Sequence, residues 1–203
     1  MIVAISGKRG AGKNAIADVL VKEFGFWRIG LADPMKRFLL HEEVFTKEQL
    51  FGPSENREEV DIRWGKSARQ ALQTLGTEWG RGFCETLWVQ ILIRDAQRIQ
   101  QLEGKNIVVT DIRYPNELAA LDAAGARLVR VRRPALGTKG RPFAPEDVQA
   151  LFKSAPSAID THTSETSLDD VPDDRFDNVL RNDGTLEDLH EKVRMMARFW
   201  GMS

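Results

Sequence analysis

The chain has 203 residues, of which 42% are apolar and 29% charged, as expected for one globular domain with a sizeable core. The formal net charge of −1 lacks the basic excess typical of proteins that grip a long nucleic-acid backbone, so nucleic acid is not an expected partner. The single cysteine, Cys84, excludes an intramolecular disulfide, and no apolar stretch approaches the roughly 20 residues of a membrane span, so no membrane partner is expected either.

The first elements alternate between strand and helix. The apolar run from Ile2 to Ile5 is typical of a buried strand, and apolar residues recur at helical spacing from about Lys13 to Phe24. Trp27 to Ala32 predicts a second short strand. Because the first strand runs directly into a glycine-rich loop, without the layout of a signal peptide, we expect a cytoplasmic protein.

A long, mostly helical stretch follows, from about residue 33 to residue 103. Its polar and charge-rich part, Pro53 to Lys66, predicts a mobile or solvated connection. Apolar residues between Ala68 and Leu75 then follow an i, i+3, i+4, i+7 pattern, and Gly76 is expected to stop that helix. A longer helix is expected to end near Gly104.

The second half of the chain continues the alternation. We expect strands at Asn106–Thr110, Arg127–Val131 and Asn178–Arg181, a helix between Pro115 and Gly125, and a final helix capped by Thr185. Residues 133 to 175 contain five of the eight prolines and predict an irregular excursion. Strands that alternate with helices predict an α/β fold, with a parallel sheet of about five strands covered by helices on both faces.

A glycine-rich loop separates the first strand from the first helix. Gly7-Lys8-Arg9-Gly10-Ala11-Gly12-Lys13-Asn14 matches G-x-x-x-x-G-K and stops one residue short of the full P-loop pattern. Its glycines let backbone N–H groups point at phosphate oxygens, and the helix start adds positive partial charge. Lys13 would reach the β- and γ-phosphates, whereas the usual Mg²⁺-binding hydroxyl is replaced by Asn14, whose amide can accept from a metal-bound water. The alternative is a glycine-rich turn without a ligand.

Asp111 directly follows the strand predicted at residues 106–110. Parallel-sheet enzymes place their working residues at the carboxyl ends of strands, so Asp111 is a candidate to hold Mg²⁺ through water or to bind an acceptor. Arg113 lies two residues on, and Glu117 lies one turn into the next helix. The alternative is a plain surface ion pair between Asp111 and Arg113.

Several basic residues also follow predicted strands. Lys36 comes after the second strand, and Arg132 and Arg133 end the fourth. Such side chains can neutralise a phosphate or close over a transferring phosphoryl group, but solvated surface charge explains any one of them equally well. Trp88 stands at helical spacing with apolar residues, so packing is its default role and stacking on a base is the sharper hypothesis.

Pieces spread along nearly the whole chain match one known family. The most specific are Leu75-Gly76-Thr77, Asp111-x-Arg113 and His162-x-x-Glu165. The others, in chain order, are Ser6-Gly7-Lys8-Arg9, Gly12-Lys13, Leu31-Ala32, Pro34, Lys36, Arg69, Gln73, Trp88-Val89, Glu117, Arg133-Pro134 and Asn182-Asp183-Gly184. With these pieces the chain resembles the phage-type deoxynucleoside monophosphate kinases, a branch of the P-loop nucleotide kinases.

The resemblance implies one three-layer P-loop kinase domain over residues 1–203. The implied reaction transfers the γ-phosphoryl group of ATP to a deoxynucleoside monophosphate, with Mg²⁺ as cofactor. The implied layout has a helical monophosphate-binding insertion at residues 33–103 and a lid at residues 133–175. A homodimer is compatible with the family, and a phage origin would place the protein in the host cytoplasm.

The resemblance also implies roles for single residues. Phosphoryl transfer would be served by Lys13, Asp111, Arg113, Arg132 and Arg133. ATP would contact Gly7, Arg9, Gly10, Ala11, Gly12, Lys13, Asn14, Asn182 and Gly184. The monophosphate would contact Lys36, Arg69, Gln73, Thr77, Trp88, Asp111, Arg113 and Glu165. Asn14 and Asp111 would contact the metal through water.

One departure and several rival functions accompany the resemblance. The family often has Asp after the P-loop lysine, so Asn14 removes a charge near the metal. Other small-molecule P-loop kinases, of the dephospho-coenzyme A or phosphomevalonate type, share the loop, but Leu75-Gly76-Thr77 and His162-x-x-Glu165 argue against them. A polynucleotide 5′-kinase would need a basic stripe that the chain lacks. A nucleotide-dependent switch ATPase would hydrolyse ATP slowly without any acceptor.

Overall fold

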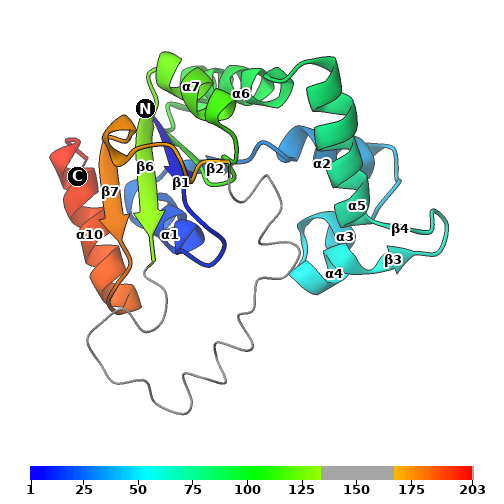
Figure 1. Ribbon diagram of the computed structural model, residues 1–203, viewed down its shortest axis with the longest axis horizontal. Helices are drawn as coiled ribbons and strands as arrows, with labels where there is room; N and C mark the ends of the chain where they lie inside the picture. The colour runs from blue at the N-terminus through cyan, green and yellow to red at the C-terminus, as the bar shows by residue number, and fades with distance from the viewer. Residues whose placement is uncertain (134–166, 203) are drawn as a thin grey trace, which may run out of the picture.

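The centre of the protein is a five-stranded sheet, seen in a computed structural model that describes residues 1–133 and 167–202. The strands are β1 (Ile2–Ser6), β2 (Trp27–Ile29), β5 (Ile107–Val109), β6 (Arg127–Arg132) and β7 (Asn178–Arg181). They lie in the order β2-β5-β1-β6-β7, and every neighbouring pair is parallel (Figure 1). The predicted α/β fold with a parallel sheet of about five strands is therefore confirmed.

Helices cover both faces of the sheet, as predicted. On one face, α1 (Lys13–Phe24) and α10 (Leu186–Phe199) pack over a core that includes Ile5 and Val129. On the other face, α6 (Leu87–Glu103) and α7 (Pro115–Ala123) pack over a core that includes Ala4 and Leu128. Alternate strand residues thus point to opposite cores, which is why β1 and β5, which are buried on both faces, are almost entirely apolar. In the described part of the chain, each helix is too short or too polar to cross a membrane.

The second strand is shorter than predicted, because it ends at Ile29 rather than Ala32. The Asp33 carboxylate accepts the Gly30 N–H at 2.7 Å, and Asp111 accepts the N–H groups of Leu31 and Ala32. These contacts turn the chain out of the sheet and into α2 (Asp33–His41).

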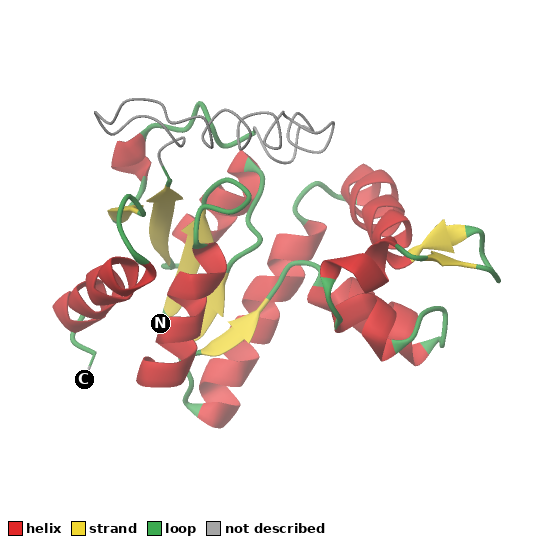
Figure 2. Cartoon of the chain, turned by 90° about the horizontal axis from the view of Figure 1, so that it is seen from below, coloured by secondary structure: helices red, strands yellow, loops and turns green. Residues whose placement is uncertain are grey.

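The helical segment, residues 33–103, lies mostly beyond the β2 edge of the sheet (Figure 2). Besides α2 and α6 it holds α3 (Lys47–Phe51), α4 (Ser54–Glu58), α5 (Ala68–Gln73) and a hairpin of β3 (Val60–Asp61) and β4 (Lys66–Ser67). Away from the sheet it has a small core of its own, made by Leu39, Phe45, Leu50 and Ala68. Partly buried apolar residues such as Leu40 and Leu72 pack against this core, which has fewer fully buried residues than either core of the sheet.

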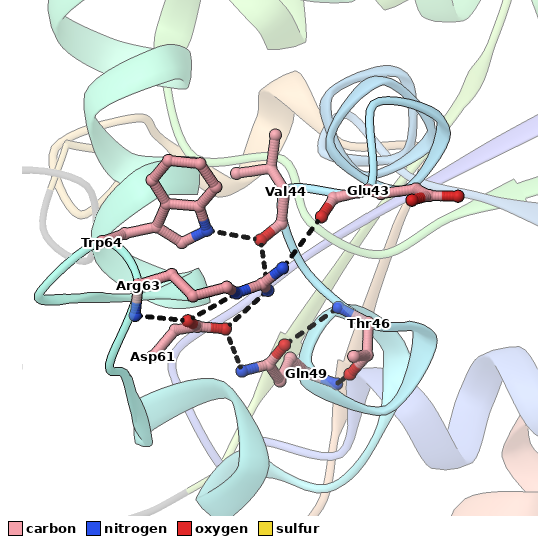
Figure 3. Close-up of polar contacts among 7 residues, drawn as sticks. All are labelled: Glu43, Val44, Thr46, Gln49, Asp61, Arg63 and Trp64. Carbon is pink, nitrogen blue, oxygen red and sulfur yellow. Dashed lines mark hydrogen bonds and ion pairs between the residues drawn. The ribbon is translucent and has the colours of Figure 1, made fainter.

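The stretch predicted as a mobile or solvated connection, Pro53–Lys66, is largely exposed, in line with the second alternative, and polar contacts give it regular structure (Figure 3). The Asp61 carboxylate accepts bonds from the Arg63 guanidinium at 2.8 and 2.9 Å and from the Gln49 amide at 3.1 Å. Arg63 and the Trp64 indole N–H in turn donate to the Val44 carbonyl, at 3.0 and 2.7 Å. The bonds from Arg63 and then Gln49 hold the pKa of Asp61 well below its usual range, so the carboxylate stays ionised and keeps the hairpin closed.

The prediction that Gly76 stops a helix is wrong. The chain continues from α5 into a π-helix, η1 (Thr74–Arg81). The Trp88 indole donates to the Gly76 carbonyl at 2.9 Å, and its ring lies so close to Gly80 that a β-carbon there would be 2.2 Å from Nε1. Packing against α6 thus outweighs the local stop signal, and π-helical turns are frequently found at functional sites.

A buried arginine anchors the chain where it returns from the residues that the structure does not describe. Arg130 of β6 is 5% exposed and donates to the carbonyls of Leu168 and Val171, at 2.8 and 2.6 Å. It also pairs with Asp173, which begins the short 3₁₀ helix η2 (Asp173–Arg175), and lies over the Phe176 ring. This anchor fixes the path into β7 and therefore the position of the residues that follow β7.

Candidate functional site

The P-loop connects β1 to α1 at the carboxyl edge of the sheet. The Lys13 ammonium donates to the carbonyls of Gly7 and Lys8, so it lies over the loop that would bind the phosphates. Arg133, which follows β6, donates to the Gly10 carbonyl at 3.2 Å. The Asn182 amide, which follows β7, donates to the Ala11 carbonyl at 2.9 Å. Three neighbouring strands thus deliver predicted ATP-site or lid residues to one loop.

The other residues predicted for ATP lie around the same loop. Arg9 is exposed and Gly12 is partly buried. A β-carbon at Gly12 would meet the Asn182 amide at 2.8 Å, so the loop and the end of β7 are in close contact. Gly184 stands one residue before Thr185, whose side chain caps α10 in the predicted way by accepting the Asp188 N–H.

The amide of Asn14, the last residue of the P-loop motif, is engaged by an arginine. Arg28, in the middle of β2, donates to the Asn14 side-chain oxygen at 2.6 Å and to the Thr110 hydroxyl at 3.0 Å. Sequence reasoning missed Arg28, because a single basic residue within a short predicted strand gives no signal. The oxygen that the sequence offers to a metal-bound water therefore already accepts a hydrogen bond.

Asp111 joins the end of β5 to the start of α2. Its carboxylate accepts the N–H groups of Leu31 and Ala32, at 3.0 and 3.3 Å. Gly30 permits this approach, since a β-carbon there would lie 2.9 Å from Asp111 Oδ2. Burial raises the pKa of Asp111, and the two N–H donors and Arg113 only partly oppose that effect. In these contacts Asp111 positions a turn.

A second carboxylate links the π-helix to α7. Glu117 is 7% exposed and accepts the N–H groups of Arg113 and Tyr114, at 2.8 and 3.1 Å, which caps the helix. Arg81, the last residue of η1, lies 3.5 Å from Glu117 and stacks over the Tyr114 ring at 3.8 Å. Burial raises the pKa of Glu117 more than the neighbouring donors lower it.

Arg81 and Tyr114 were both missed by sequence reasoning, although the capping pattern of Pro115 and Glu117 marks the place. A helix N-terminus, a cation and an aromatic ring meet there, next to the predicted acceptor residues Asp111 and Arg113. The Glu117 carboxylate is the anion that the helix N-terminus and Arg81 hold in this arrangement.

Four of the residues predicted for the monophosphate, Lys36, Arg69, Gln73 and Thr77, lie on three elements of the helical segment, α2, α5 and η1. Lys36 stands on α2, 3.9 Å from Asp33 and over the Phe51 ring. A β-carbon at Gly76 would lie 3.1 Å from Met35 Sδ, so α2 touches η1, where exposed Thr77 stands. Exposed Gln73 ends α5, and Arg69 of the same helix pairs with Glu58 at 2.9 Å.

Trp88 is different, because its ring packs against Gly80 and its N–H is bonded to Gly76. These contacts tie α6 to the π-helix and are those of a packing residue.

The residues predicted for the lid divide between two places. Arg133 contacts the P-loop, whereas Arg132 pairs with Asp173 at 2.7 Å. Glu165, His162 and most of the predicted lid at residues 133–175 lie outside the described residues.

The residues present do not fit a metal ion held directly by side chains. In the described ranges, no group of three or more His, Cys, Asp or Glu side chains is placed to hold a metal. Asn14 accepts from Arg28, and both Asp111 oxygens accept backbone N–H groups. The two residues predicted to contact Mg²⁺ through water thus each accept hydrogen bonds from the protein's own donors.

Comparisons with known proteins show what the whole chain is similar to. No protein-family model matches the chain. A protein of Acanthamoeba polyphaga mimivirus, provisionally named a deoxynucleotide monophosphate kinase, is 26% identical over 95% of this chain and 94% of its own length. The deoxynucleotide monophosphate kinase of Enterobacteria phage T4 is 29% identical over 66% of this chain and 46% of its own length.

Among solved structures, the dephospho-CoA kinase of Campylobacter jejuni matches 98% of this chain and 96% of its own, with 14% identity and a TM-score of 0.49. A shikimate kinase of Aquifex aeolicus matches 99% of this chain and 98% of its own, with 10% identity and a TM-score of 0.46. The two sequence matches show that the chain is homologous to the viral and phage deoxynucleotide monophosphate kinases.

Proposed function

We propose that the protein transfers the γ-phosphoryl group of ATP to a deoxynucleoside 5′-monophosphate, which gives ADP and the deoxynucleoside diphosphate. One observation carries the proposal: two half-sites meet at the carboxyl edge of the sheet. The P-loop follows β1, and Asp111 follows the neighbouring strand β5 and holds the turn that leads from β2 into the helical segment. Parallel-sheet proteins bind ligands at this edge, and the homology to named kinases supports the same reaction.

The transfer itself needs alignment and charge neutralisation more than covalent help. An oxygen of the acceptor phosphate attacks the γ-phosphorus while the bond from that phosphorus to the β–γ bridging oxygen breaks, and ADP leaves with the bridging oxygen. Lys13 would neutralise the donor phosphates from its place over the loop. Arg133, already at Gly10, would add charge from the other side, and Arg132 would join it on release from Asp173.

The acceptor would lie between the sheet and the helical segment, so residues 33–103 form the monophosphate-binding insertion in this proposal. Lys36, Arg69, Gln73 and Thr77 are its contacts on the segment, and Arg113 is its contact on the core. Asp111 orients the acceptor by holding the start of α2. Residues 133–175 form the lid, which includes Glu165 near the sugar or base.

Mg²⁺ would enter with ATP, bound to the phosphates, because the described side chains do not fit a direct site. When bound, it would neutralise phosphate charge. The single cysteine, Cys84, suits a reducing compartment, and we place the reaction in the cytoplasm.

The test is ADP release in a coupled assay, with each of the four deoxynucleoside monophosphates offered separately to the full chain. We expect turnover with at least one acceptor, and a loss of about 10²–10³-fold in Lys13→Ala, the scale of removing one preorganised donor. Lys22→Ala, which removes an exposed lysine from the last turn of the same helix, is the matched control and should retain full activity. ATP hydrolysis that no acceptor changes would contradict the proposal and favour a switch ATPase.

A further inference from the structure

Arg28 connects three elements beneath the P-loop. Its Nη2 donates to Asn14 on α1 and to Thr110 after β5, and its Nη1 lies 3.5 Å from Asp18, one turn further along α1. The guanidinium therefore spans α1, β2 and β5 at the place where the P-loop becomes a helix. A planar fork with several fixed donors is suited to such a bridge, and it is charged at any pH at which the protein folds.

Arg28 donates to the side chain of Asn14, and Asn14 is the residue at which this P-loop departs from the full motif. A Ser or Thr hydroxyl at that position holds Mg²⁺ in the full pattern, and here the residue is Asn14. A cation that took the Asn14 oxygen would have to break a 2.6 Å charge-assisted hydrogen bond and would approach the guanidinium charge. The departure from the motif and the arginine are thus two parts of one arrangement.

We propose that Arg28 is a positioning residue for the P-loop, which fixes Asn14 and supplies a resident positive charge beside the nucleotide phosphates. The proposal rests on the proposed function in one respect, namely that the nucleotide is ATP. Its consequence is specific: the affinity for the triphosphate depends less on Mg²⁺ than it would with a hydroxyl at residue 14. Arg28 acts through Asn14 and through its charge, and it takes no part in bond making.

The experiment measures ATP binding to the full chain by calorimetry, once with EDTA and once with excess Mg²⁺. In Arg28→Ala we expect the affinity for metal-free ATP to fall about tenfold, while the affinity for Mg²⁺-ATP falls less, because the metal then supplies the missing charge. Arg28→Lys should keep part of the metal-free affinity, since it keeps the charge without the fork. Asn14→Thr should raise the Mg²⁺ dependence by returning the hydroxyl.

Arg37→Ala is the matched control, because Arg37 is an exposed arginine of α2 paired with Asp95 at 2.8 Å. It should change neither affinity. Thermal unfolding of each variant shows that the folded protein is being compared. Equal losses of both affinities in Arg28→Ala, or no loss in either, would overturn the proposal.

The proposed function fails separately from this inference. A wild-type chain that binds no ATP in either condition would contradict the kinase itself. A wild-type chain that phosphorylates a deoxynucleoside monophosphate, but whose Mg²⁺ dependence is unaltered in Arg28→Ala and Asn14→Thr, would contradict only the role of Arg28.

Discussion

The sheet core and the outer part of the helical segment are held together by different forces. The core buries the apolar residues of its strands between two helical layers, and these strands can be predicted from local residue types. Outside α6, the segment buries only a small apolar cluster and is ordered by side chains that bond to distant backbone groups, such as Arg63 to Val44 and Trp88 to Gly76. The proposed donor site thus stands on the region with more apolar burial, and the proposed acceptor site stands on the region with less.

This difference suits a kinase that must admit and release an acceptor. Regions with few buried apolar contacts open at lower free energy than the core, and substrate-closing elements are drawn from them. Substitutions in the core should therefore lower the stability of the whole protein. Substitutions in the segment should weaken acceptor binding and leave ATP binding unchanged.

The largest effect should come from Gly7→Ala in the core. A β-carbon at Gly7 would lie 2.5 Å from the Val131 carbonyl oxygen, which belongs to the backbone of β6 and has no room to move. We expect the free energy of unfolding to fall by about 3 kcal/mol, from overpacking and from a φ of 155° that favours glycine. Urea denaturation with a single transition would measure the loss.

Gly10→Ala is the control that separates the clash between residue 7 and Val131 from the loss of stability caused by any alanine in the loop. Gly10 also has a positive φ, but a β-carbon there would meet nothing within 4 Å. It should therefore cost less than Gly7→Ala. Equal losses in the two variants would show that the contact between the P-loop and β6 is not what holds the loop.

A smaller effect is expected from Glu117, which joins the segment to the core. Glu117→Ala removes the acceptor of two backbone N–H groups and the partner of Arg81, which should cost about 2 kcal/mol. Glu117→Gln should cost less, because its amide oxygen can still accept the two N–H groups. Chemical denaturation of both variants at neutral pH would show which of them loses more free energy of unfolding.

The pH dependence offers a second measurement on Glu117. Burial raises its pKa in the folded state, so as pH rises above the ordinary value of about 4.3 the unfolded chain loses the proton first. The contribution of Glu117 to stability therefore falls with rising pH, until the folded-state pKa is passed. Glu117→Gln should remove that slope, whereas Glu103→Gln, at an exposed glutamate that ends α6, should keep it.

The difference between the sheet core and the helical segment also explains which elements could be predicted from the sequence. The strands, the helices α1, α7 and α10 and the P-loop follow from periodicity, glycines and capping residues within a few positions of one another. The hairpin at Asp61 and the π-helix after Gln73 do not, because Gln49, Val44 and Trp88 act on them from 12 or more positions away.

The candidate site shows the same limit at single residues. Lys13 and Asp111 could be selected because each follows an apolar strand directly, which is a local signal. Arg28 reaches Thr110 across 82 positions, and Arg81 reaches Glu117 across 36, so only the folded chain shows these pairs. Asp111 also illustrates the difference between place and role: the sequence located it, and the structure adds its bonds to Leu31 and Ala32.

The smallest effect should come from Trp88→Phe, which keeps the packing of α6 on the π-helix and removes one bond, the indole N–H to the Gly76 carbonyl. The loss should be about 1 kcal/mol and local, because the core makes no use of that bond. Trp64→Phe is the matched control, since it removes a similar indole bond, to Val44, at the far hairpin.

If the acceptor lies along the π-helix, Trp88→Phe should raise the KM for the monophosphate several-fold, while Trp64→Phe leaves it unchanged and both variants bind ATP normally. An equal rise of this KM in the two variants would mean that the whole helical segment loosens as one unit. Loss of ATP binding in Trp88→Phe would mean that substitutions in the segment also disturb the sheet core, contrary to the comparison.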